Sequence, residues 1–151
     1  MNTFRIRRAL IVVAVLASSH QAVYALTPDD AGTYEWLKPD GRPSGVLYQL
    51  SRSNDGSGKW VARGRLPNHE WKDVSCDSGC QYHGSSADDL KRFFPESWLT
   101  NANISCIQND AQAFCAYSGK TDSSRNGHII FTLVTPKPIP VMVRRVANPQ
   151  D

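Results

Sequence analysis

The sequence is poor in cysteine and in long apolar runs. Only four of its 151 residues are cysteine, and none precedes Cys76, so a lipid-attachment cysteine near the N-terminus is excluded. One apolar run stands out, at positions 9–17, and no later segment approaches the roughly 20 apolar residues that a membrane-spanning helix requires. We therefore expect no membrane span. With 40% hydrophobic and 21% charged residues, the composition excludes a disordered chain and is typical of one globular domain.

The sequence also lacks the common local motifs of catalysis. His69-Glu70 resembles the start of a zinc-protease helix, but the second histidine would have to stand at position 73, which is Asp73. Gly119-Lys120-Thr121 resembles the end of a phosphate-binding loop, but position 114, where the first glycine belongs, is Phe114. Neither a Gly-x-Ser-x-Gly nor a Ser-x-x-Lys motif occurs. These absences favour a binding protein over an enzyme.

Residues 1–25 have the pattern of a secretory signal peptide. Three arginines and no acidic residue occupy positions 1–8, the apolar run at 9–17 follows, and small residues stand at the two positions that a signal peptidase reads before Leu26. A retained anchor or a buried helix is the alternative interpretation. We expect cleavage before Leu26 and a single exported domain at 26–151, either periplasmic or secreted.

The net charge of the chain comes from that N-terminal segment. The full sequence carries 17 Lys and Arg against 14 Asp and Glu, and three of the arginines lie within residues 1–25. Residues 26–151 therefore have 14 residues of each sign. A nucleic-acid binder needs an excess of basic residues to displace counterions, so nucleic acid is not an expected partner.

The even number of cysteines in an exported domain predicts two disulfides. The segments 104–108 and 112–117 have the pattern of two strands, and folding them as a hairpin about Asp110–Ala111 places Cys106 opposite Cys115. Directly opposed residues of a hairpin are close enough for a disulfide. This pairing leaves Cys76 and Cys80 to close a small loop.

Two alternatives to these disulfides remain open. Crossed pairings would tie the Cys76–Cys80 loop to the hairpin. Alternatively, Cys76, Cys80 and His83 could bind zinc, but a structural zinc site typically has four ligands in two close pairs, and the other two cysteines do not form a close pair. We expect no metal and no cofactor.

The remaining pattern predicts an α+β fold that is mainly antiparallel sheet. A helix is expected to begin after Ser86 and to end at Pro95, with a further turn at 96–100 that directs Trp98 and Leu99 inward. Eight short strands then make a sheet that can curl into a half-barrel stabilised by disulfides. They are expected at 33–37, 46–52, 59–65, 71–74, 104–108, 112–117, 128–134 and 141–146.

A recognition surface is expected around the first cysteine loop. Aromatic side chains, both charge signs and two histidines flank it, and a loop pinned by a disulfide loses little entropy when it docks. The candidate binding residues are His69, Glu70, Trp71, Lys72, Tyr82 and His83. The alternative is that Trp71 and Tyr82 are core residues.

Three classes of function follow from these patterns. The first is an exported, non-enzymatic binding protein that engages a protein partner, as inhibitors and immunity proteins do. The second is a carrier of a small apolar ligand, with a pocket lined by Tyr48, Trp60, Phe131 and Trp98. The third is a small hydrolase that uses one of the three histidines after residue 25, at positions 69, 83 and 128. The sequence does not indicate an oligomeric state.

Overall fold

The computed structural model describes residues 26–74 and 81–147. They form one antiparallel sheet of nine strands in the order β4-β3-β2-β1-β9-β8-β7-β6-β5. Two meanders, β1–β4 and β5–β9, are joined by the pairing of β1 with β9. The sheet curls into the expected half-barrel, and the described residues are mostly β with two short α-helices. The predicted signal peptide and the Cys76–Cys80 pair lie outside the described residues.

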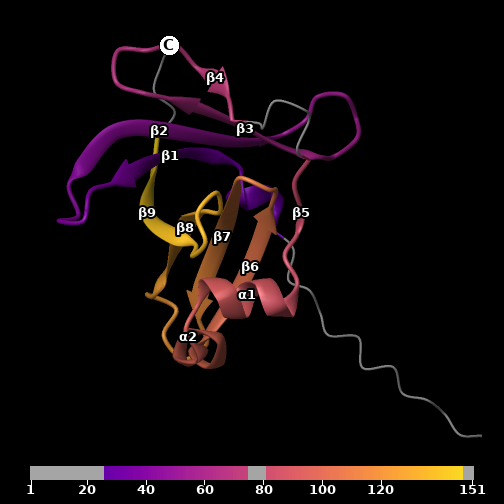
Figure 1. Cartoon of the computed structure of the whole chain (residues 1–151), viewed down its shortest axis with the longest axis vertical. Helices are drawn as coiled ribbons and strands as arrows, with labels where there is room; N and C mark the ends of the chain where they lie inside the picture. The colour runs from indigo at the N-terminus through magenta and orange to yellow at the C-terminus, as the bar shows by residue number, and fades with distance from the viewer. Residues whose placement is uncertain (1–25, 75–80, 148–151) are drawn as a thin grey trace, which may run out of the picture.

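The first meander runs across the upper part of the molecule (Figure 1). Its turns use the residues expected from the sequence, because Gly41, Gly56 and Gly58 all have positive φ angles. The predicted strand at 71–74 is shorter than expected, since only two of its residues pair with β3. The strands are β1 (Gly32–Leu37), β2 (Pro43–Arg52), β3 (Trp60–Arg65) and β4 (Lys72–Asp73).

The second meander contains the long central strands and one short edge strand. The strand predicted at 128–134 is central as expected, since β8 pairs with both β7 and β9. The edge strand β5 was not expected from the sequence, because two residues are too few to show a period. The strands are β5 (His83–Gly84), β6 (Ala102–Gln108), β7 (Gln112–Gly119), β8 (Asn126–Thr132) and β9 (Ile139–Val146).

The helices lie across β6 and β7 at the lower end of the molecule (Figure 1). Ser86 caps α1 (Ala87–Phe93) as predicted, since its hydroxyl accepts from the Asp89 N–H at 3.1 Å and its own N–H donates to the Asp89 carboxylate at 2.9 Å. Pro95 is the N-cap of α2 (Glu96–Asn101), and a 3-10 turn, η1, covers Pro28–Asp30. None of the helices among the described residues is long and apolar enough to cross a membrane.

Two apolar clusters lie on the two faces of the sheet. The inner cluster fills the half-barrel around Phe114, whose ring contacts those of Tyr34 and Tyr48 at centroid distances of 5.0 and 5.9 Å. The outer cluster lies under the helices, where Phe131 contacts Phe93 and Phe94, each at 5.1 Å. Because neighbouring residues of a strand point to opposite faces, β7 and β8 contribute alternate side chains to both clusters.

The cysteine hairpin has the register predicted from its sequence. Cys106 is opposite Cys115, Ile107 is opposite Phe114 and Ile104 is opposite Tyr117. The two cysteines form a disulfide with a Cα–Cα distance of 4.1 Å, and both are buried under the helices. At the turn, the Asn109 side-chain oxygen accepts from the backbone N–H groups of residues 111 and 112 at 2.9 Å, which explains why this short segment reverses here.

We predict that replacing both Cys106 and Cys115 with alanine lowers the free energy of unfolding by about 3 kcal/mol, because the unfolded chain then regains the freedom of a short loop. Urea denaturation followed by circular dichroism measures this loss. The hairpin pairing itself should survive, so the native spectrum should not change. A loss below about 1 kcal/mol would show that the cross-link adds little to the strand pairing.

Candidate functional site

A groove of about 420 Å³ opens at the mouth of the half-barrel, between β1–β4 and the first residue of β7. We call it the edge groove. Its walls are largely apolar and its rim carries charges of both signs. The apolar lining comprises Trp36, Val46, Leu47, Tyr48, Leu66 and Val74, and the charged and titratable lining comprises Arg65, His69, Glu70, Lys72 and Asp73.

Three of the six predicted binding residues line the edge groove: His69, Glu70 and Lys72. The turn between β3 and β4 brings them there. Asn68 has a positive φ of 61°, which asparagine tolerates well, and the His69 N–H donates to the Leu66 carbonyl at 3.1 Å. The turn therefore presents Leu66 and His69 on the same lip of the groove.

Trp71 lies beside this rim without lining the groove. Its side chain is half-buried, and the Arg65 guanidinium lies 5.0 Å from the centre of its ring. Such a cation–π contact orients the arginine, which does line the groove. Trp71 is thus placed to support the charged rim.

The other two predicted residues lie elsewhere. Tyr82 packs against the inner cluster, which agrees with the alternative that it is a core residue. His83 is exposed on β5, at the opposite end of the strand order from β4. Of the six residues, His69, Glu70 and Lys72 therefore share the edge groove, whereas Tyr82 and His83 do not line it.

Tyr82 belongs to a polar cluster at the mouth of the half-barrel. Its hydroxyl lies 2.9 Å from the Tyr48 hydroxyl, and the Gln112 side-chain amide donates to the Tyr82 hydroxyl and, at 3.4 Å, to the Tyr48 hydroxyl. Burial raises the pKa of Tyr82 and raises that of Tyr48 well above its ordinary value. Both phenols therefore stay neutral. Their hydrogen bonds with each other and with Gln112 link the first meander to the second.

A second groove of about 430 Å³ adjoins the edge groove at Val74. Trp60, Val61, Ala62 and Tyr82 form much of its lining. Val74 and Gln81, the described residues on either side of positions 75–80, both line the groove. The predicted Cys76–Cys80 loop itself lies outside the described residues.

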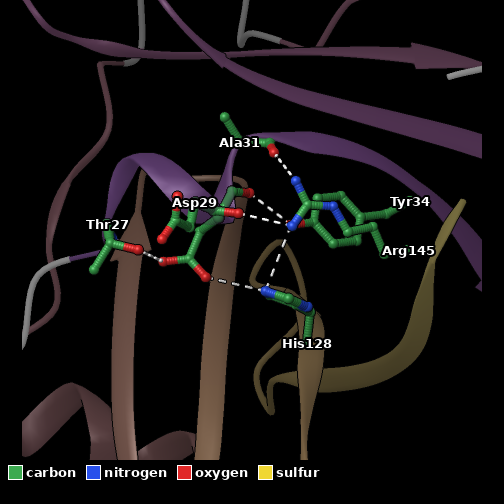
Figure 2. A network of polar contacts seen from close by, with 7 residues as sticks. Thr27, Asp29, Ala31, Tyr34, His128 and Arg145 are labelled. Atoms are coloured by element: carbon green, nitrogen blue, oxygen red, sulfur yellow. Dashed lines mark hydrogen bonds and ion pairs between the residues drawn. The ribbon is translucent and has the colours of Figure 1, made fainter. Parts of the chain in front are cut away.

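A network of polar contacts holds the segment before β1 against the sheet (Figure 2). The His128 Nε2 lies 3.1 Å from the Asp30 Oδ1, and the Tyr34 hydroxyl donates to the Asp30 carbonyl at 2.6 Å. Because a carboxylate only accepts, Nε2 carries the hydrogen of this contact. Arg145 donates to the carbonyls of Asp29 and Ala31 from β9. The segment before β1 is therefore held by side chains of both β8 and β9.

The contacts of His128 indicate that this network has a structural role. The Tyr34 and Phe114 rings pack against the His128 ring at 4.7 and 5.4 Å, and His128 lines neither of the two grooves. Burial, the largest effect, lowers the pKa of His128, and the nearby Asp30 carboxylate opposes this shift. Burial also favours the neutral form of Tyr34, whose pKa it raises to about 12. Sequence reasoning missed this pairing because Asp30 and His128 lie 98 positions apart.

The four residues expected to line a carrier pocket are not brought together. Tyr48 and Trp60 belong to the inner cluster, Phe131 belongs to the outer cluster, and Trp98 is 36% exposed rather than turned inward. Among residues 26–74 and 81–147, no group of three or more His, Cys, Asp or Glu side chains could hold a metal ion.

Comparison of the chain with protein-family models, with curated proteins and with solved structures finds no significant match. The function must therefore be argued from the geometry of these grooves and contacts.

We predict that acid destabilises the fold through His128. Its pKa is lower in the folded protein than in the unfolded chain, so the unfolded state binds more protons as the pH falls below about 6.5. The free energy of unfolding should fall with pH in this window, by at most about 1.4 kcal/mol per pH unit.

The variant His128→Gln keeps a neutral hydrogen-bonding side chain and removes this titration. Urea denaturation of both proteins between pH 7 and 5, a window about one unit or more above the ordinary pKa values of the carboxyl groups, gives the comparison. The variant should have the shallower slope. Equal slopes would contradict the assignment of the acid sensitivity to His128.

Proposed function

We propose that this chain is an exported, non-enzymatic binding protein that engages a protein partner at the edge groove. The observation that carries the proposal is the composition of that groove, in which an apolar wall lies inside a rim of both charge signs. Protein–protein interfaces have this arrangement, with an apolar centre surrounded by polar residues.

The groove is built on paired strands, which supports a role in recognition. Its walls come from β1, β2 and β3, and Tyr48 is locked by the hydroxyl contact with Tyr82 and by stacking on Phe114. A surface that is already ordered loses little entropy when a partner docks. The turn that carries Leu66 and His69 adds the apolar and titratable groups of the rim.

Two side chains of the groove have properties that suit a docking surface. Leu66 is 57% exposed at the lip of the groove, where a partner can bury its apolar surface. The indole N–H of Trp36 is buried in the wall and has no hydrogen-bond partner among the described residues, which is unfavourable for a buried donor. Departures from the rules of stability tend to occur at functional sites. They favour the edge groove as the docking surface.

The proposal is tested by photo-crosslinking at Leu66. A photoreactive phenylalanine analogue replaces Leu66, or in the control Val134, which is 73% exposed and does not line the groove. After irradiation in the source cells, position 66 should give one discrete adduct with another protein, and position 134 should not. Mass spectrometry identifies the adduct. Adducts at both positions, or at neither, would contradict the proposal.

Affinity for the captured partner should then depend on the groove. We predict that Leu66→Asp weakens binding at least tenfold, because it places a charge in the apolar part of the interface, whereas Val134→Asp leaves binding unchanged. Isothermal titration calorimetry measures both. Since both side chains are exposed, thermal unfolding should show little change in stability for either variant.

A further inference from the structure

A separate pocket of about 280 Å³ is lined by residues of α2, the start of β6 and the end of β7. In Figure 1, α2 lies at the opposite end of the molecule from the first meander. The pocket shares no lining residue with the edge groove. Its lining includes two aromatic side chains, Trp98 and Tyr117, and three polar ones, Ser97, Asn101 and Arg125. The volume is near the lower limit of small-molecule pockets.

The indole of Trp98 is partly exposed but contacts two other aromatic rings. Trp98 stacks on Phe94 with a centroid distance of 5.6 Å and meets the edge of Tyr117 at 5.1 Å. Tyr117 lies close over Gly127, because a Cβ at that glycine would come within 2.7 Å of the phenol oxygen. The indole is thus fixed by its neighbours while 36% of the residue remains exposed. A fixed aromatic face binds a ligand with little loss of entropy.

Asn101 and Arg125 carry more hydrogen-bonding groups than their contacts among the described residues use. Asn101 donates one amide hydrogen to the Ser97 carbonyl at 2.8 Å, a bond that does not use its side-chain oxygen or its second amide hydrogen. Arg125 is paired through Nε with Asp122 at 3.5 Å, and its side chain is 83% exposed. Such an exposed ion pair is weak, so the guanidinium can turn toward a ligand.

This combination selects one class of ligand. An organic cation would suit the aromatic rings, but the Arg125 guanidinium repels it. A purely apolar ligand would make no use of the amide and guanidinium groups in the lining. A pyranose ring uses both kinds of group, because its C–H face packs on an aromatic ring and its hydroxyls accept and donate hydrogen bonds. We propose that this pocket binds a sugar residue of a carbohydrate, stacked on Trp98 and hydrogen-bonded to Asn101 and Arg125.

The test is a titration of the ¹⁵N-labelled protein followed by NMR. The chain has four tryptophans, each with one indole N–H signal, and Trp98→Phe assigns the signal of Trp98. The probes are the methyl pyranosides of glucose, galactose, N-acetylglucosamine and glucuronic acid. At least one should shift the Trp98 signal in a saturable manner, with a Kd in the millimolar range. The Trp71 indole, which also has an arginine beside it, serves as the internal control and should not shift.

Variants of the polar lining residues test the proposal without changing Trp98. Asn101→Ala and Arg125→Ala alter exposed side chains, and each should weaken the binding of that pyranoside at least threefold. Sodium acetate is the control for a simple anion. The proposal is overturned if no pyranoside shifts the Trp98 signal, if acetate shifts it equally, or if both polar variants bind like the wild type.

Discussion

The pairing of β1 with β9 is the contact on which the rest of the fold depends. It runs from Thr33 opposite Val146 to Trp36 opposite Val143, and the Glu35–Arg144 ion pair, at 2.8 Å, spans the same two strands. Every other strand pair joins neighbours in sequence order. Without this pairing β1 and β9 would each keep only one neighbouring strand. The inner cluster could not form either, because Tyr34 reaches Phe114 only across the joined sheet.

The same junction fixes the segment that precedes β1. Arg145 on β9 holds two of its carbonyls, and Gly32 leaves the space for this arginine, since a Cβ there would lie 2.9 Å from the Arg145 Nε. His128 on β8 then holds Asp30, and Leu26 is buried in the inner cluster. The segment therefore covers one part of the inner cluster only when β1, β8 and β9 are already assembled, which couples it to the global stability of the sheet.

What sequence reasoning could predict was local. The hairpin of Cys106 and Cys115 was predicted in register because its turn and its two strands are contiguous, and the cap at Ser86 was predicted for the same reason. The β1–β9 pairing and the His128–Asp30 contact join residues about a hundred positions apart and leave no local pattern. Likewise, His69 lines the groove as part of one turn, whereas His83 lies on the opposite edge strand.

The incomplete closure of the sheet explains where the edge groove lies. A closed barrel would cover its inner face with strands all round, but here the order ends in β4 and β5, each of two residues. Such short edges protect the sheet from pairing with other chains. They also leave an opening at the mouth of the half-barrel, where the buried side chains of Tyr48 and Gln112 and the strand partner of Tyr48, Gly64, line the groove. Recognition at the edge groove would thus use an opening that an unclosed sheet leaves.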